Sequence, residues 1–406
     1  MRGLTRDVQA VLQRRLRPGA TTPLAVGFSG GGDSLALLRL TLDWAELRGR
    51  PVLALTVDHG LNPASAGWTA DALAKARALG AQAQALHWIG DKPSTGVQAA
   101  ARAARHALLA AAAREAGACV LLLGHTADDR LEAARMRAEG STTSDPRQWA
   151  PSPVWPEGRG VFVLRPLLEA RRQALREWLS QRGETWLEDP ANDDARFARA
   201  RARAALAGED PAVPPLAPDP APPAAFEGEH ALRLPREAPA AQVAAACLCA
   251  AGAATPPRGE RLERLVARLR SGEAFTATLA GARIVAGEAG ALFVREAGEG
   301  RRSGLSPLVL AAGETGVWDG RYEITAGAQP ITVRPLGGLA GRLPADETQA
   351  LKGFPAAVRP VLPAAVDAVG MVSSPILAEA GTIGARVLIR ERFEAATGLI
   401  DQEPAT

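Results

Sequence analysis

Short hydrophobic runs and amphipathic stretches alternate from about residue 20 to residue 207 of the 406-residue chain. Each run is bounded by turn-forming residues and is followed by apolar residues at helical spacing, which predicts strands followed by helices. The predicted strands cover residues 23–28, 52–57, 81–89, 119–123 and 162–167. The predicted helices cover residues 34–47, 64–79, 97–116, 127–138, 171–182 and 193–206. This alternation predicts an α/β fold, a Rossmann-like parallel sheet with helices on both faces, whose ligands bind beyond the carboxyl ends of the strands.

The pattern changes twice outside these elements. Residues 140–160 are rich in Pro, Ser, Thr and Gly and predict a long exposed loop. The Pro-rich residues 210–224 predict a semi-rigid linker between a first domain, 1–209, and a C-terminal region, 225–406. In that region two helices, at 240–250 and 258–269, precede short apolar runs separated by glycines, so we expect a helical segment and then a smaller β-rich part.

Composition and charge narrow the class of protein. The chain is 47% apolar and 22% charged, which is ordinary for a globular protein, and its net charge of +3 is too small to indicate a nucleic-acid partner. Of the 47 basic residues only three are lysine, which leaves 44 arginines, so any phosphate clamp rests mainly on Arg. No secretory leader pattern and no uninterrupted apolar span is found, so we expect a cytoplasmic protein without a membrane segment. The three cysteines lack metal-ligand spacing, and we expect Cys119 to be a buried thiol.

The strongest chemical signal is LAVGFSGGGDSLALL, residues 24–38, in which a strand leads through glycines into a helix. Glycines let the backbone approach an anion closely, and the free N–H groups of a helix start favour negative charge. The loop consists of Ser29, Gly30, Gly31, Gly32, Asp33 and Ser34. We expect the serine hydroxyls to bind phosphate oxygens and Asp33 to hold a Mg²⁺, because a bare carboxylate would repel phosphate. The loop lacks the GK[ST] of a P-loop, and Leu35 excludes the GxGxxG fingerprint.

This loop resembles the pyrophosphate loop of the N-type ATP pyrophosphatases. Within that group, residues 20–207 resemble the tRNA(Ile)-lysidine synthetases. The resembling blocks are LTVDHGLNPAS (55–65), AARAARHALL (100–109), LLGHTADDRLEAARMRAEGS (122–141), RPLLEARRQALREWL (165–179) and WLEDPANDDARFARARAR (186–203). The RPLL and DPAN blocks separate this family from other ATP pyrophosphatases.

The resemblance implies an activity and its partners. Members of that family join L-lysine to C2 of the wobble cytidine in a tRNA(Ile) with the anticodon CAU. ATP is the co-substrate and Mg²⁺ the expected metal. Cytidine O2 attacks the α-phosphate and releases pyrophosphate, and the lysine ε-amine then displaces AMP. The cytosine must leave the anticodon stack to react, as single-stranded RNA permits.

The resemblance also assigns residues. His125 and Asp129 are candidates at the reacting end of the fourth strand, and Asp58 follows the second strand above the nucleotide. Arg102 and Arg105 are expected to meet the triphosphate or an anticodon phosphate. The expected substrate clamp on one helix face consists of Arg196, Arg199 and Arg203. Whether His125 or an aspartate takes the lysine proton stays open at this stage.

Some residues depart from the family pattern. Thr126 and Arg130 replace a His and a Gln, Ala133 replaces a Thr, and His106 stands where an aromatic residue is common. One alternative is therefore another ATP pyrophosphatase, such as a tRNA thiolase or an amide-forming NAD or GMP synthetase. A second is a tRNA-binding protein with a decayed nucleotide site. A homodimer is compatible with the sequence but is not indicated by it.

Overall fold

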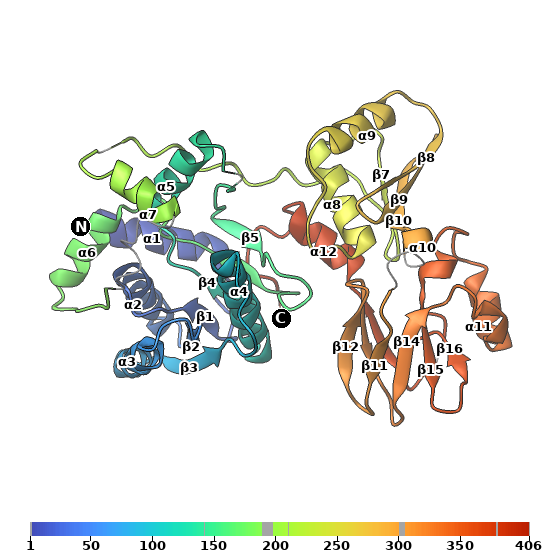
Figure 1. The fold of residues 1–406 in the computed structure, drawn as a ribbon, viewed down its shortest axis with the longest axis horizontal. Coiled ribbons are helices and arrows are strands. Elements are labelled where there is room, and N and C mark those ends of the chain that lie inside the picture. The colour runs from blue at the N-terminus through green and yellow to red at the C-terminus, as the bar shows by residue number, and fades with distance from the viewer. Residues whose placement is uncertain are drawn as a thin grey trace. The chain divides into compact units, whose positions relative to one another are not determined.

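The computed structural model of this chain describes residues 2–141, 143–188, 198–209, 211–299, 305–378 and 381–405 (Figure 1). They fall into two compact units. The first comprises Met1–Asp219 with Ile400–Thr406, and the second comprises Pro220–Leu399. None of the helices in these described ranges is both long enough and apolar enough to cross a bilayer.

The first unit contains the predicted alternation of strands and helices. Its helices are α1 (Arg2–Arg15), α2 (Gly32–Glu46), α3 (Ser65–Ala78), α4 (Val97–Glu115), α5 (Ala127–Ala138), α6 (Arg172–Ser180) and α7 (Ala198–Ala205). Its strands are β1 (Leu24–Gly27), β2 (Val52–Asp58), β3 (Gln82–His87), β4 (Val120–Leu122), β5 (Trp149–Pro151) and β6 (Phe162–Leu164). Helix α1 was not among the predicted elements, although its buried residues Val8, Val11 and Leu12 recur at helical spacing.

The six strands form one sheet in the order β3-β2-β1-β4-β6-β5. All neighbouring pairs are parallel except β5 with β6. The chain moves outward from β1 to β2 and β3 and then returns to place β4 on the other side of β1. Because parallel crossovers are right-handed, this reversal puts α4 on the face opposite α2 and α3. The α/β class with helices on both faces is confirmed, and the reversal leaves a crevice between β1 and β4 where such folds bind ligands.

Helix α4 covers its face of the sheet through small and branched side chains. Leu109 and Ala113 on the helix pack in one core cluster with Ala25, Leu53 and Leu121 on the strands. The strands therefore carry buried residues on both faces, as the continuous apolar runs predicted.

The segment 140–160 is not the wholly exposed loop that its composition predicted. It contains the edge strand β5, and Trp149 is buried because its ring stacks on Phe162 at a centroid distance of 5.0 Å. The indole Nε1 of Trp149 also donates to the carbonyl of Ile400 at 2.8 Å. A distant partner and an aromatic stack thus order a stretch that looks like a loop in sequence.

Arg130 of helix α5 binds the part of the Pro-rich stretch that belongs to the first unit. Its side chain is almost fully buried, and its guanidinium donates to the carbonyls of Pro214 (2.8 Å) and Pro215 (2.9 Å). Proline removes N–H donors but keeps carbonyl acceptors, so a buried Arg suits such a segment. The residue that departs from the family pattern at this position therefore serves a local structural contact.

Residues 400–405 lie against the amino ends of the strands. Glu403 is fully buried and forms two hydrogen bonds with the Arg50 guanidinium, which precedes β2. The backbone N–H of Arg17 also donates to Glu403, at 2.9 Å, and the Cys119 thiol lies 3.6 Å from it. Burial, and then Glu403, raise the pKa of the partly buried Cys119 to about 11.

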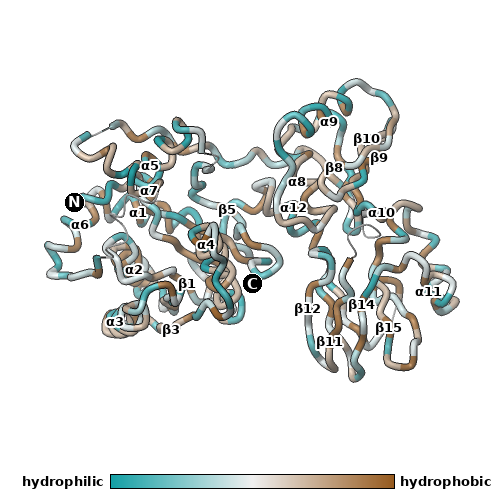
Figure 2. The backbone as a smooth tube through the Cα atoms, in the orientation of Figure 1, coloured by the Kyte–Doolittle hydropathy of each residue, from teal (hydrophilic) through white to brown (hydrophobic). Residues whose placement is uncertain are grey.

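The second unit contains the expected helices, preceded by one short strand, and three antiparallel sheets. Its helices are α8 (Ala240–Ala251), α9 (Glu260–Arg270), α10 (Ala297–Glu299), α11 (Ala345–Leu351) and α12 (Ile389–Ala396). Its strands are β7 (Leu232–Leu234), β8 (Phe275–Leu279), β9 (Ala282–Gly287), β10 (Gly290–Arg295), β11 (Leu308–Leu310), β12 (Thr315–Trp318), β13 (Tyr322–Thr325), β14 (Ile331–Pro335), β15 (Pro363–Asp367), β16 (Val372–Ser373) and β17 (Gly384–Val387). The sheets run β7-β10-β9-β8, β11-β14-β15-β16 and β12-β13-β17. Figure 2 shows α9 mostly hydrophilic, consistent with one buried stripe containing Leu265 and Leu269. The predicted β-rich character is confirmed.

Candidate active site

The glycine loop lies at the crevice between β1 and β4, where its shape depends on glycine. Gly30 has a φ of +83°, and a Cβ there would stand 2.6 Å from the Cδ1 atom of Leu187. The N–H of Leu187 donates to the carbonyl of Gly30 at 2.9 Å. Across the crevice, a Cβ on Gly124 would come within 3.2 Å of the Asp33 backbone. The loop is therefore braced on two sides, by Leu187 and by Gly124.

The two serines of the loop have different surroundings. The buried Ser34 hydroxyl donates to the carbonyl of Gly31 at 2.9 Å and accepts from the N–H of Ser29 at 3.2 Å. Ser29 is exposed, and its hydroxyl lies 3.1 Å from that of Ser34. Ser34 thus fixes the loop, whereas Ser29 lies at its open side. Helix α2 begins at Gly32, and the first N–H groups of any helix lack partners within it, which makes this end an anion site.

Asp33 is joined to an arginine of another element. The Nε atom of Arg172 donates to its carboxylate at 3.0 Å. Burial raises the pKa of Asp33 and the nearby Asp129 charge adds to this, while Arg172 opposes the rise. Two carboxylates are therefore held near one cation at the start of α2.

Arg172 is the centre of this acidic group. Its guanidinium lies 3.6 Å from Asp129 and 3.2 Å from Glu132, in addition to the contact with Asp33. Its backbone N–H donates to Asp128 at 2.7 Å, which ties the start of α6 to α5. Burial alone would lower the pKa of Arg172, but the three carboxylates raise it.

Asp129 serves both the helix and the site. Thr126 is the N-cap of α5: its N–H donates to a carboxylate oxygen of Asp129 at 2.7 Å and its hydroxyl accepts from the Asp129 N–H at 3.4 Å, forming a capping box. The other oxygen faces Arg172 and Arg199. Burial would raise the pKa of Asp129, but His125 and these arginines outweigh it and lower the pKa. The residue Thr126, which departs from the family pattern, supplies the cap.

Three arginines, Arg102, Arg105 and Arg165, act electrostatically on His125. Burial and mutual repulsion lower the pKa of Arg105 and of Arg165 to about 10, and burial and Arg199 lower that of Arg102. The buried Nε atoms of Arg105 and Arg165 have no hydrogen-bond partner among the described residues. Burial first, and then Arg165, hold the pKa of His125 well below its usual 6.5, so its imidazole is neutral at pH 7. The Asp129 carboxylate opposes this lowering of the pKa at Arg102 and Arg105.

Glu132 forms ion pairs with two arginines of helix α7, Arg199 and Arg203. It is 1% exposed, and its carboxylate lies 2.9 Å from Nε of Arg203 and 3.5 Å from Nε of Arg199. The acid that balances this basic face thus comes from α5, not from α7. The third expected clamp residue, Arg196, lies outside the described residues.

Asp58 uses its carboxylate locally. The N–H of Gly60 donates to it at 2.8 Å, closing the turn after β2. Burial acts to raise its pKa, yet this bond and nearby groups lower it overall. The structure therefore places Asp58 at the expected strand end with one oxygen engaged in its own turn.

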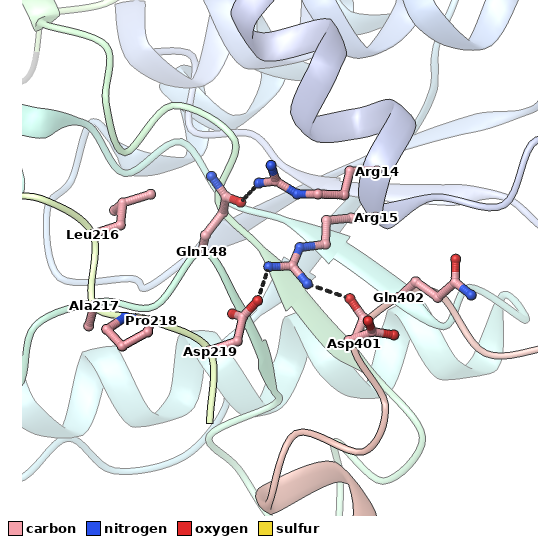
Figure 3. Close-up of a pocket in the computed structure, with 9 residues that line it drawn as sticks. All are labelled: Arg14, Arg15, Gln148, Leu216, Ala217, Pro218, Asp219, Asp401 and Gln402. Atoms are coloured by element: carbon pink, nitrogen blue, oxygen red, sulfur yellow. Dashed lines mark hydrogen bonds and ion pairs between the residues drawn. The ribbon is translucent and has the colours of Figure 1, made fainter. Parts of the chain in front are cut away.

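Two hollows of the first unit differ in character. The one beside the acidic group measures about 190 Å³. It is lined by the acids Asp128, Glu132 and Glu209, the arginines Arg171, Arg172 and Arg203, and apolar residues. The other measures about 520 Å³, and in its lining Arg14 is bonded to Gln148 and Arg15 to Asp219 (Figure 3). The smaller hollow adjoins the glycine loop's partners, so we place the chemistry there.

Residue-level reasoning on the sequence missed Arg172, Glu132 and Arg165. All three stand inside the resembling blocks, but the blocks did not show that they converge. Trp186 and Leu187, which pack against the glycine loop, likewise stand inside a resembling block, at the start of WLEDPAN. Only the resemblance of these blocks to the family could have indicated these residues, because no residue spacing within the sequence does.

The donor set fits a Mg²⁺ ion shared with a ligand. Carboxylate oxygens suit Mg²⁺, which in phosphate sites takes one or two carboxylates plus phosphate oxygens and water. Asp33 and Asp129 offer such oxygens on either side of Arg172. Within the described ranges no group of three or more His, Cys, Asp or Glu side chains is placed to hold a metal by itself.

Comparison with known proteins supplies the family. Residues 4–209 match the PP-loop domain. The chain is 58% identical to the tRNA(Ile)-lysidine synthase of Caulobacter vibrioides, over 98% of this chain and 99% of that protein. It is 40% identical to the tRNA(Ile)-lysidine synthase of Hyphomonas neptunium, over 65% of this chain and 79% of that protein. Among solved structures, the U34-tRNA thiolase NcsA of Methanococcus maripaludis is similar at a TM-score of 0.43 and 19% identity, over 51% of this chain and 72% of that one.

Proposed function

This chain belongs to the tRNA(Ile)-lysidine synthase family, and from that premise we propose that it joins L-lysine to C2 of the wobble cytidine in a tRNA(Ile) with the anticodon CAU. It is an ATP-dependent ligase that modifies tRNA. We also propose which residues bind its substrates, which of them hold a metal, and in which order the steps occur.

One observation carries the phosphate chemistry: helix α2 begins at the glycine loop, and the buried Nε atoms of Arg105 and Arg165, which act on His125, have no hydrogen-bond partner among the described residues. Placing the triphosphate there would satisfy the unpaired Nε atoms of Arg105 and Arg165 and the amides of the loop. In the first step cytidine O2 forms a bond to the α-phosphorus, and the bond to pyrophosphate breaks. These donors would stabilise the charge that develops on the phosphates. Asp33, with Asp129, would hold a Mg²⁺ that neutralises phosphate charge when bound.

The second step needs lysine beside the activated cytidine. The 190 Å³ hollow carries three acids and three arginines, a balance that suits a zwitterion with an extra amine. We propose that the arginines receive the lysine carboxylate and that Asp128 receives an ammonium group. The ε-amine then forms a bond to C2, the C2–O2 bond breaks, and AMP leaves with that oxygen.

The amine must lose a proton, and we propose His125 as the acceptor. Its imidazole is neutral, because burial first, and then Arg165 with smaller effects of Arg105 and Arg102, hold its pKa well below 6.5. A phosphate anion beside Arg102 and Arg105 would oppose the effect of these two arginines and so raise the pKa of His125. Nucleotide binding would thus prepare the base for the second step.

The assay that tests the function measures AMP and pyrophosphate release by the full chain with ATP, lysine and a CAU-anticodon tRNA. We expect release that depends on both lysine and the tRNA, together with a tRNA product heavier by one lysyl group. AMP release that requires ammonia or a sulfur donor instead would favour another ATP pyrophosphatase. Tight tRNA binding without any AMP would identify a binding protein with a decayed site.

Asp128→Asn tests the lysine site. The asparagine oxygen can still accept the N–H of Arg172, so the helix contact is kept while the charge is lost. A charged hydrogen bond contributes about 1.5–3 kcal/mol, so we expect the KM for lysine to rise roughly 10- to 100-fold with the KM for ATP nearly unchanged. Glu169→Gln, at an exposed acid outside the lining of the hollow, is the control and should change neither. An unchanged KM for lysine in Asp128→Asn would place the amino acid elsewhere.

Where the protein works follows from its substrates. We propose the cytoplasm, because ATP, lysine and tRNA are all available there. Arg199 and Arg203 bind Glu132, so we propose that they position the acidic group, with RNA contact by Arg199, the more exposed of the two. A homodimer stays a prediction from sequence, and no step proposed above requires one.

A further inference from the structure

Trp88, His59 and Lys92 form a cluster at the carboxyl edge of the sheet that the reaction steps above do not use. The Nζ atom of Lys92 lies 4.2 Å above the Trp88 ring, and its ammonium donates to the Trp88 carbonyl. The His59 imidazole meets the indole edge-on, with centroids 6.2 Å apart and ring planes at 87°. The cluster is thus an aromatic ring with a cation over one face and an imidazole perpendicular to its plane.

The position of this cluster is fixed by the sheet. The N–H of Trp88 donates to the carbonyl of Asp58 at 3.0 Å, which continues the ladder between β2 and β3 by one bond. Trp88 is half-buried, and the next residue, Ile89, is 87% exposed. The indole therefore sits on a rigid element at the border of solvent, which suits a contact surface better than a core.

Trp88 and Lys92 of the cluster follow β3, two strands from β1 in the sheet, and Arg105 connects the cluster electrostatically with the reaction centre. Arg105 acts electrostatically on His125 on one side and on His59 on the other. Burial first, and then Arg105, lower the pKa of His59, and its buried Nδ1 atom has no hydrogen-bond partner among the described residues. A polynucleotide with its phosphate beside Arg105 would bring a base within reach of Trp88.

We propose that Trp88 is a stacking platform for a nucleobase, with Lys92 and His59 holding the indole in place. Aromatic side chains beside cations recognise bases because every base offers a π-face and a neighbouring phosphate. The base belongs either to the RNA next to the reacting cytidine or to ATP. The inference rests on the proposed function for its assay but concerns a residue to which none of the proposed steps assigns a role.

The test compares Trp88→Phe with Trp88→Leu in the full chain, using the lysine- and tRNA-dependent release of AMP. Leucine keeps an apolar side chain without a flat ring, whereas phenylalanine keeps the ring. Stacking predicts that Trp88→Leu raises one KM about 5- to 150-fold and that Trp88→Phe stays within a few-fold of the wild-type protein. A rise confined to the KM for tRNA assigns the base to RNA, and a rise confined to the KM for ATP assigns it to adenine.

Ile89→Ala is the matched control, because Ile89 shares the loop and lies in neither the cluster nor the reaction centre. Intrinsic fluorescence gives a second readout: an anticodon stem-loop RNA or ATP should quench the wild-type protein more than Trp88→Phe. Equal KM values in Trp88→Leu and the wild-type protein overturn the inference, as does equal loss in the Phe and Leu variants. A wild-type protein without lysine-dependent activity would instead overturn the proposed function.

Discussion

Asp33→Asn is expected to lower the rate of lysine- and tRNA-dependent AMP release by about 10²- to 10³-fold. The asparagine keeps the volume and an oxygen that can accept from Arg172 Nε, so the loop should keep its shape. What is lost is the negative charge beside the phosphate-binding amides, and with it the proposed carboxylate for Mg²⁺. The kcat should fall, while the dissociation constant of the tRNA, measured by filter binding, stays within about threefold.

Asp43→Asn is the matched control, since it makes the same change on the same helix, α2, away from the glycine loop. It should leave both AMP release and tRNA binding near wild-type values. If Asp33→Asn turned over at the wild-type rate, the assignment of Asp33 to the reacting phosphates would be wrong. Loss of tRNA binding together with turnover would instead point to a collapsed loop, which the thermal stability of the variant would reveal.

The sequence was sufficient for the elements that form from local pattern. The runs at 23–28, 52–57 and 119–123 became β1, β2 and β4, because continuous apolar residues suit strands buried on both faces. The glycine loop was also predictable, since Gly30 occupies a left-handed conformation at the turn between strand and helix. Local chemistry fixed these features, so no distant partner had to be known.

The convergence of side chains could not be predicted in the same way. Arg172 reaches Asp33 across 139 positions of sequence, and no spacing rule connects a helix start with a loop that far away. Strand β5 shows the same problem, because Trp149 is ordered by Phe162 and by the carbonyl of Ile400. Family resemblance named the blocks that contain these residues, but only the folded sheet shows which of their side chains meet.

The largest effect on stability is expected from Glu403→Gln. Arg50 and Glu403 are separated by 353 positions, and their side chains are 1% and 0% exposed. Glutamine retains the size of the side chain but leaves the buried guanidinium of Arg50 without its counter-charge. Breaking one side of a buried ion pair costs about 3–5 kcal/mol, so the free energy of unfolding of the first unit should fall by that amount.

Urea unfolding followed by circular dichroism measures this change, and Asp401→Asn is the control because only its backbone carbonyl bonds to Arg15. Pairing Glu403→Gln with Arg50→Met removes both charges, and a double-mutant cycle should recover much of the lost stability. The pair lies at the amino ends of the strands, away from the glycine loop, so the kcat of the folded fraction should hardly change. If Glu403→Gln unfolded at the wild-type urea concentration, the ion pair would not contribute to the free energy of unfolding of the first unit. Residues 400–405 would then contact the first unit without stabilising it.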